Sequence, residues 1–193
     1  MCPADNKKVL IISAPSGAGK TTLINHLMGS GFPLLFSVSA TSRKPRGREK
    51  EGREYYFITA AEFRKRIRND EFIEWQEVYE NHYYGTLRRE IERIRDAEKI
   101  PLFDVDVMGG MNLKKIFGND ALSIFIMPPS VEELERRLVL RGTDTPEKIA
   151  MRVEKASSEI LLAEHFDRVV INDDLEQARI DIVNIVRDFV EGP

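Results

Sequence analysis

Residues 13–21 read SAPSGAGKT and combine the residue types that bind phosphate in many proteins. Glycines let backbone N–H groups wrap around a phosphate, and the N-terminus of a following helix adds a partial positive charge. Lys20 would reach the terminal phosphates of a nucleotide, and the Thr21 hydroxyl would ligate Mg²⁺. The strict motif has glycine where this chain has Ala14, a residue that disfavours a positive φ. We predict a phosphate loop rather than an ordinary turn, because an apolar strand precedes it and a helix follows it.

Two carboxylates lie in or beside an apolar strand that is predicted at residues 102–105. A carboxylate such as Asp104 inside a buried strand must be paired or bound to a ligand. At the carboxyl end of a parallel strand it would face the crevice where ligands bind, and Asp106 would lie on the same side of the strand. The alternative is that both residues make structural hydrogen bonds to backbone or arginine, and the two roles are compatible.

Arginines gather between the phosphate loop and that strand. Residues 37–47 read SVSATSRKPRG. Arg43 and Arg46 could hold the phosphate of a second nucleotide, because the planar guanidinium matches phosphate bidentately. The charged run that follows, residues 48–53, interleaves basic and acidic residues and is more typical of a solvated face.

A second set of arginines lies nearer the C-terminus. Arg137 and Arg141 are four residues apart and therefore share one face of a helix, and Arg152 follows beyond a glycine turn. These arginines could close over phosphates. Alternatively, they could form a solvated basic stripe paired with Glu133 and Glu135.

The predicted elements would position these groups at one edge of a parallel sheet. Short apolar runs predict buried strands at residues 9–12, 102–105, 124–127 and 169–171. Helical spacing and capping residues predict helices at 20–28, from 131, from 146 and at 175–190. Because strands alternate with helices, the expected fold class is α/β, a parallel sheet flanked by helices on both faces.

The region from residue 36 to about 87 interrupts this alternation. It contains short strand-like pieces at 36–41, 55–57 and 73–75, a helix opened by a capping box at 59–62, and clustered arginines. We interpret it as an inserted subdomain. A second interruption, residues 141–145, joins two helices and could act as a mobile lid.

The composition places these motifs in one soluble domain. The chain has 193 residues, and 29 basic residues nearly balance 32 acidic ones, which argues against a general nucleic-acid coat. A single cysteine, Cys2, excludes a disulfide framework, and no apolar run approaches the roughly 18 residues that span a bilayer. The polar start of the chain differs from a signal peptide. We therefore expect a cytoplasmic protein with no membrane or nucleic-acid partner.

The chain resembles the guanylate kinase family. The segments that carry the resemblance occur in the family's order over nearly the whole chain: residues 13–22, 37–46, 52–57, 71–75, 81–86, 104–106, 128–130, 141–143 and 170–174. The resemblance implies the P-loop nucleoside-monophosphate-kinase fold, with a core (1–35, 88–140 and 153–193), a GMP-binding insertion (about 36–87) and a lid (about 141–152). It implies a stand-alone, bacterial-type enzyme that transfers the terminal phosphoryl group of ATP to GMP, and to dGMP, with Mg²⁺. The oligomeric state, monomer or homodimer, stays open.

The resemblance also assigns residues by motif. ATP would be bound by Ala14, Pro15, Ser16, Gly17, Ala18, Gly19, Lys20, Thr21, Thr22, Arg137, Arg141 and Asn172. GMP would be bound by Ser39, Arg43, Arg46, Tyr55, Glu74, Tyr84, Thr86 and Asp104. Catalysis would rest on Lys20, Arg43, Arg137, Arg141 and Arg152, and Thr21 would hold Mg²⁺ that is bound mostly by ATP phosphates and water. Because the attacking phosphate oxygen of GMP is already anionic near neutral pH, no general base is required.

The chemistry of guanine agrees with this assignment. Guanine presents N1–H and an exocyclic amino group as adjacent donors, which one carboxylate such as Glu74 can accept, and its O6 accepts from a hydroxyl such as that of Thr86. Adenine reverses this polarity and would leave the site unpaired. Without the resemblance, Glu74 would be interpreted as a surface carboxylate beside Trp75 on an edge strand, and Asn172 as a turn-capping residue before Asp173.

Two other functions fit parts of the sequence. A scaffold module could bind phosphorylated peptides through the same arginines, although such modules have lost phosphate-loop residues that are present here. A related kinase could act on another small phosphorylated metabolite, which Glu74 and Thr86 argue against. Besides Ala14, the chain departs from the family at Met108, where glutamine is usual, and at Leu87, where a small polar residue is common.

Overall fold

A parallel sheet forms the central layer of the protein. The computed structural model describes residues 7–47, 49–142 and 144–192. Within them, five strands are hydrogen-bonded in the order β2-β7-β1-β8-β9, and every neighbouring pair is parallel. Their bounds are β1 (Val9–Ser13), β2 (Leu34–Phe36), β7 (Ile100–Val105), β8 (Ala121–Met127) and β9 (Arg168–Ile171). The predicted α/β class and the four strands expected from apolar runs are confirmed.

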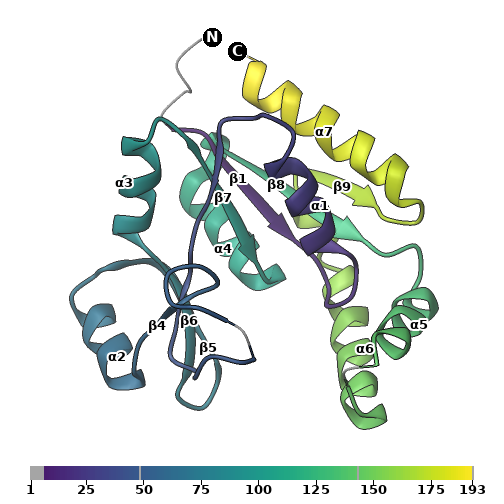
Figure 1. The fold of residues 1–193 in the computed structure, drawn as a ribbon, viewed down its shortest axis with the longest axis horizontal. Helices are drawn as coiled ribbons and strands as arrows, with labels where there is room; N and C mark the ends of the chain where they lie inside the picture. The colour runs from purple at the N-terminus through teal and green to yellow at the C-terminus, as the bar shows by residue number, and fades with distance from the viewer. Residues whose placement is uncertain (1–6, 48, 143, 193) are drawn as a thin grey trace.

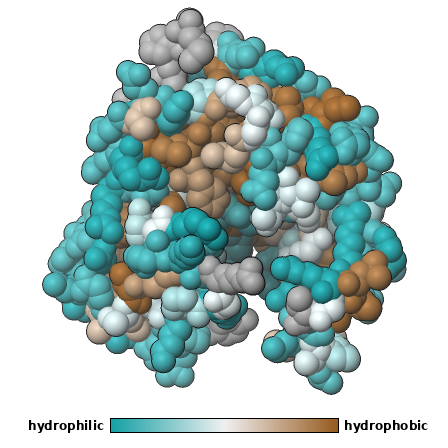
Figure 2. Space-filling model, viewed as in Figure 1, coloured by the Kyte–Doolittle hydropathy of each residue, from teal (hydrophilic) through white to brown (hydrophobic). Residues whose placement is uncertain are grey.

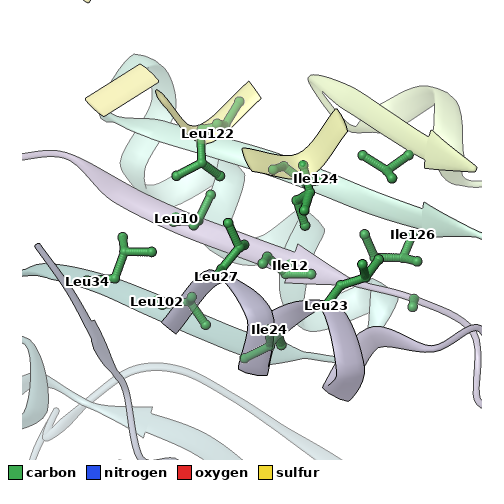
Figure 3. Packing of buried hydrophobic residues seen from close by; sticks show 14 of the residues in the cluster. Leu10, Ile12, Leu23, Ile24, Leu27, Leu34, Leu102, Leu122, Ile124 and Ile126 are labelled. Atoms are coloured by element: carbon green, nitrogen blue, oxygen red, sulfur yellow. The ribbon is translucent and has the colours of Figure 1, made fainter. Parts of the chain in front are cut away.

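Helices cover both faces of this sheet (Figure 1). Because alternate residues of a strand point to opposite faces, the central strand β1 contacts both helical layers. Leu10 and Ile12 are fully buried against α1 and α7, and Figure 3 shows this packing from close by. Val9 and Ile11 are fully buried against α3 and α4 on the other face. The helices are α1 (Lys20–Met28), α2 (Ala60–Arg68), α3 (Arg88–Asp96), α4 (Val107–Phe117), α5 (Val131–Arg141), α6 (Pro146–Ile160) and α7 (Leu175–Glu191), with short 3-10 helices at Gly118–Asp120 and Ala163–His165.

A second, smaller sheet is built from the middle of the chain. Its strands are β3 (Ala40–Thr41), β4 (Tyr56–Phe57), β5 (Phe72–Tyr79) and β6 (His82–Leu87), in the order β4-β3-β6-β5. Helix α2 packs on it through Phe63, whose ring stacks on Phe72 and Tyr83 at centroid distances of 4.2 and 5.2 Å. The predicted capping box opens this helix, since the Thr59 hydroxyl accepts a hydrogen bond from the Glu62 N–H.

The strand-like piece predicted at residues 36–41 is divided between the two sheets. Phe36 ends β2, which pairs with β7 at the edge of the central sheet, and the second sheet begins only at Ala40. The Ser37 N–H still donates to the Leu102 carbonyl at 2.9 Å, so the chain leaves the central sheet after this residue. The sequence analysis gives no bounds for α3 and α4, although α3 has the spacing of an amphipathic helix, with Ile91 and Ile94 buried on one face.

Helices α5 and α6 form a pair beside the central sheet (Figure 1). Their contact is apolar and includes Leu134, Leu138, Ile149 and Ala156. The predicted cap is seen at α5, where the Ser130 hydroxyl accepts from the Glu133 N–H. At α6, Pro146 is in the first turn as predicted and Thr145 is the N-cap residue, but the Thr145 side chain makes no capping hydrogen bond. Residues 142 and 144–145 connect these helices, within the segment for which the sequence predicts a lid.

Cys2 lies outside the described residues, as do residue 48 of the charged run 48–53 and residue 143 of the predicted lid. In the described part of the chain, we find no helix whose length and apolar character would allow it to cross a membrane.

Candidate functional site

A cleft of about 1120 Å³ opens at the carboxyl edge of the central sheet. It lies between the second sheet, at the lower left of Figures 1 and 2, and the α5–α6 pair at the lower right, and Figure 2 shows the hollow between them. The residues predicted to act that line it are Ala14, Pro15, Ser16, Gly17, Gly19, Lys20, Thr21, Thr22, Ser39, Tyr55, Glu74, Tyr84, Asp104, Arg137, Arg141 and Arg152. Ala18, Arg43, Arg46, Thr86 and Asn172 are not part of this lining.

The phosphate loop connects β1 to α1, as predicted. The positive φ angles of this loop belong to Gly17 (+99°) and Gly19 (+94°), where a side chain would be strained. Ala14 has no positive φ and is buried, so a glycine is not needed at the opening position. Gly19 caps α1 without a side chain, which leaves the first N–H groups of the helix directed at the cleft.

Lys20 reaches the end of the neighbouring strand. Because β1 and β7 are adjacent and parallel, the start of α1 lies beside the carboxyl end of β7. The Lys20 ammonium forms an ion pair with the Asp104 carboxylate and donates to the Val105 carbonyl at 3.0 Å. The predicted loop cation and strand carboxylate therefore share one corner of the cleft.

Asp106 makes structural hydrogen bonds and still lines the cleft. One carboxylate oxygen accepts from the Gly109 N–H at 2.8 Å and caps α4, and the other accepts from the Gln76 side-chain amide at 2.7 Å. The alternative of structural pairing is thus correct for this residue. Gln76 is not predicted from sequence, because its partner Asp106 is 30 residues away, at the start of α4.

Glu74 lies opposite Thr86 in the antiparallel pair β5–β6. The Thr86 hydroxyl, which is fully buried, donates to Glu74 Oε1 at 3.0 Å. Burial raises the pKa of Glu74 to about 7; the Thr86 hydrogen bond opposes this shift, and the nearby Asp106 charge adds to it. Strand β5 is an edge strand, but the exposed residue at this place is Trp75, which points the other way. Glu74 is therefore a half-buried carboxylate that faces the cleft, with Thr86 holding it from behind.

Arg43 is held by several partners beside the cleft. Its guanidinium forms two hydrogen bonds with the Glu49 carboxylate, at 2.6 and 2.7 Å, and donates from Nε to the Tyr84 hydroxyl at 3.0 Å. It also lies 4.9 Å from the centroid of the Tyr55 ring. The hydrogen bonds from Arg43 hold the pKa of Glu49 down at about 2.

Glu49 also ties Arg46 to this cluster. The Arg46 backbone N–H donates to the same carboxylate at 2.7 Å, while the Arg46 residue itself is exposed. The charged run 48–53 is predicted to form a solvated face, and this prediction is wrong for Glu49. The pattern of charges carried no signal that distinguishes this glutamate from its neighbours.

The C-terminal arginines line the opposite wall of the cleft. Arg137 donates to Glu133 at 2.9 Å and to the Asn172 carbonyl at 3.0 Å. Arg152 forms an ion pair with Asp144 at 3.1 Å. The predicted pairing of Arg137 with Glu133 is confirmed, and Arg137 also lines the cleft.

Asn172 supports the phosphate loop. Its side-chain amide donates to the Ala18 carbonyl at 2.7 Å, and the residue is buried. A Cβ added at Gly19 would collide with this amide. The alternative of a turn cap is wrong, because Asp174 caps the following helix α7.

Two further lining residues, Lys155 and Glu159, come from α6. They pair at 3.3 Å, and burial raises the pKa of Glu159. Both follow Arg152 at helical spacing, so the position of Arg152 on the cleft wall was the signal that could have identified them.

The cleft can thus hold two phosphorylated ligands. The phosphate loop offers N–H groups and a lysine on one side, and Arg43 with two tyrosines lies near the half-buried Glu74 carboxylate on the other. A family model for guanylate kinase matches residues 6–189. The chain is 52% identical to guanylate kinases of Bacteroides fragilis and Porphyromonas gingivalis, over 95% of this chain and 90% or 98% of those proteins. The crystal structure of a guanylate kinase from Anaplasma phagocytophilum superposes with a TM-score of 0.75 at 34% identity, over 95% of this chain and 86% of that one.

Proposed function

The chain belongs to the guanylate kinase family, and we propose that the cleft is the place where it performs the reaction of that family. That reaction is the transfer of the terminal phosphoryl group of ATP to GMP, which gives ADP and GDP. The observation that supports this location best is the half-buried carboxylate of Glu74, whose pKa is raised. It is the acceptor that guanine's adjacent donors require, and it lies in the same cleft as the phosphate loop.

We propose that ATP occupies the wall formed by the phosphate loop. Gly17 and Gly19 allow the backbone to approach the phosphates, and Lys20 would exchange its carboxylate partner Asp104 for the terminal phosphates. Arg137, Arg141 and Arg152 would neutralise the charge that develops during transfer. Asn172 would act by fixing the loop rather than by lining the cleft.

We propose that GMP occupies the wall formed by the second sheet. A guanidinium has five N–H donors, and Arg43 uses four of them on Tyr84, Glu49 and the Lys44 carbonyl. The fifth would go to the GMP phosphate, together with the hydroxyls of Ser39, Tyr55 and Tyr84 and the side chain of Arg46. Glu74 would accept from guanine, with Asp104 nearby.

Mg²⁺ would enter with ATP and neutralise phosphate charge. The Thr21 hydroxyl, in the first turn of α1, lines the cleft and is a suitable oxygen ligand. Among the described residues, no group of three histidine, cysteine, aspartate or glutamate side chains could hold a metal by itself.

We propose that the second sheet with α2 is the GMP-binding insertion predicted at about 36–87, and that the α5–α6 connection at about 141–152 is the lid. Their approach would exclude water and limit ATP hydrolysis. A cytoplasmic location and the use of dGMP as a second acceptor stay predictions.

The test is ATP consumption in the presence of Mg²⁺ with GMP, dGMP, AMP, CMP or UMP as acceptor. We expect turnover with GMP and dGMP, and a rate with AMP that is lower by a factor of about 100 or more, because adenine leaves Glu74 unpaired. The absence of turnover with every acceptor would favour a phosphopeptide-binding module. Equal rates with GMP and AMP would contradict the role of Glu74.

A further inference from the structure

A buried carboxylate outside the cleft links the two segments that carry proposed GMP contacts. Glu90, in the first turn of α3, is only 1% exposed and is not one of the cleft-lining residues. Its Oε1 accepts from the Val38 N–H at 2.9 Å, and its Oε2 accepts from the Tyr56 hydroxyl at 3.0 Å. Arg93, one helical turn later, donates to both oxygens, at 2.6 and 3.1 Å.

Both tethered residues are chain neighbours of cleft residues. Val38 precedes Ser39, and Tyr56 follows Tyr55, and both Ser39 and Tyr55 line the cleft. The Tyr56 N–H also donates to the Ser39 carbonyl at 2.9 Å, so the two segments are joined to each other as well as to Glu90. The Glu90 carboxylate therefore anchors the chain neighbours of Ser39 and Tyr55, and so fixes the positions from which the hydroxyls of Ser39 and Tyr55 face the cleft.

The surroundings of Glu90 stabilise the ionised form of its carboxyl group. Burial alone would raise its pKa, but hydrogen bonds from Arg93, the Val38 N–H and Tyr56 outweigh that effect and keep the pKa below its usual value. The first turn of a helix also favours an anion. Arg93 donates further to the Phe36 carbonyl at 3.3 Å, at the residue where the chain leaves the central sheet. The cluster thus spans the connection between the central sheet and the second sheet.

We infer that Glu90 is a positioning residue for GMP binding, which sets Ser39 and Tyr55 against the GMP phosphate through Val38 and Tyr56. This inference rests on the proposed function of the cleft. The ATP wall is built from other elements, so loss of Glu90 affects GMP binding selectively. A residue that served only stability would change the melting temperature and leave the two substrates' KM values in the same ratio.

The test compares Glu90→Gln, Tyr56→Phe and the control Glu92→Gln. Glu90→Gln keeps the shape of the side chain and one acceptor oxygen but loses the charge that holds Arg93 and Tyr56. Tyr56→Phe removes a single hydrogen bond at the edge of the cluster and keeps the ring. Glu92 is an exposed glutamate of the same helix. For each protein, KM for GMP is measured at saturating ATP, KM for ATP at saturating GMP, and the melting temperature alongside.

We expect Glu90→Gln to raise KM for GMP about tenfold, equivalent to about 1.4 kcal/mol, and to change KM for ATP less than twofold. Tyr56→Phe should raise KM for GMP about threefold, in the same direction, and Glu92→Gln should match the wild type. A fall in melting temperature without a change in KM for GMP, or an equal rise in both KM values, would overturn the inference. If Glu90→Gln does not fold, Tyr56→Phe decides it. Failure of the wild type to phosphorylate GMP would instead refute the proposed function, and the inference with it.

Discussion

Lowering the pH from 8 to 6 should weaken GMP binding by protonating Glu74. The pKa of this carboxyl is raised by burial to about 7 in the protein without substrate. Guanine offers two N–H donors, so only the ionised carboxylate can accept both, whereas the protonated form presents a competing donor. At pH 8 about 90% of the molecules carry the ionised form, and at pH 6 about 10% do.

The expected magnitude follows from these fractions. Between pH 8 and pH 6 the dissociation constant of GMP should rise about tenfold through Glu74 alone. At pH 7, binding should release about half a proton from this group, which calorimetry detects as a dependence of the binding heat on the buffer. The Thr86 hydrogen bond lowers the pKa of Glu74, so Thr86→Val should move the midpoint of the pH profile above 7.

The same pKa makes a prediction about stability. A carboxyl whose pKa rises from 4.5 in the unfolded chain to about 7 in the folded protein binds protons more strongly when folded, so stability is lost as the pH rises through this window. At pH 8 the cost is about 3 kcal/mol, and at pH 5 it is below about 1 kcal/mol. Glu74→Gln should therefore stabilise the protein at pH 8, while it abolishes selective binding of GMP.

The assay is titration calorimetry of GMP at pH 6, 7 and 8, with urea unfolding of wild type and Glu74→Gln at pH 5 and 8. The phosphate of GMP also titrates near pH 6, and Glu74→Gln keeps this contribution, so the difference between the two proteins isolates Glu74. The reasoning is refuted if the wild type and the variant show the same dependence on pH. It is also refuted if Glu74→Gln gains no stability at pH 8.

Two further predictions concern the phosphate loop and the hairpin that carries Glu74. Lys20→Ala should lower kcat by a factor of about 100 or more without unfolding the protein. The control Lys115→Ala, on the exposed side of α4, should leave turnover unchanged. Equal rates for the two variants would contradict the assignment of Lys20 to the phosphate loop. Gly85→Ala should destabilise the protein by about 1–3 kcal/mol in urea unfolding and weaken GMP binding, because a Cβ at this position would lie 2.7 Å from the Glu74 carbonyl oxygen. Gly29→Ala, where the nearest atom would be at 3.5 Å, is the matched control, and a similar loss in both variants would count against strand displacement as the cause.

The parts of the fold that sequence predicted are those with local causes. Helix α1 and the strand before it follow from a contiguous apolar run and a glycine-rich turn, and the capping boxes at Thr59 and Ser130 act within one turn of helix. The bounds of β2 are not predicted, because this strand is three residues long and forms only by pairing with β7. Pairing between segments far apart in sequence has no local signature.

The same distinction applies to the candidate site. Residues on the phosphate loop were predicted as a group because their chemistry depends on spacing along one turn. Gln76 and Glu90 are not predicted because each acts on partners far away in the sequence, Asp106 for the first and Val38 and Tyr56 for the second. Glu49 is only six residues from its partner Arg43, but it lies in a run of mixed charges that does not single it out. In sequence, each of these three residues looks like an ordinary polar residue of a solvated face.

Ala14 shows why a departure from a motif must be judged by backbone conformation. A glycine is required where φ is positive or where another group approaches too closely for a Cβ. In this loop Gly17 and Gly19 both have a positive φ, and a Cβ at Gly19 would also collide with the Asn172 amide. Ala14 has no positive φ. An alanine there fills space in the core and leaves the N–H groups of the predicted phosphate loop where they are, so the substitution is compatible with the proposed ATP binding. The same reasoning predicts that a side chain at position 19 abolishes ATP binding, because that side chain would have to displace Asn172.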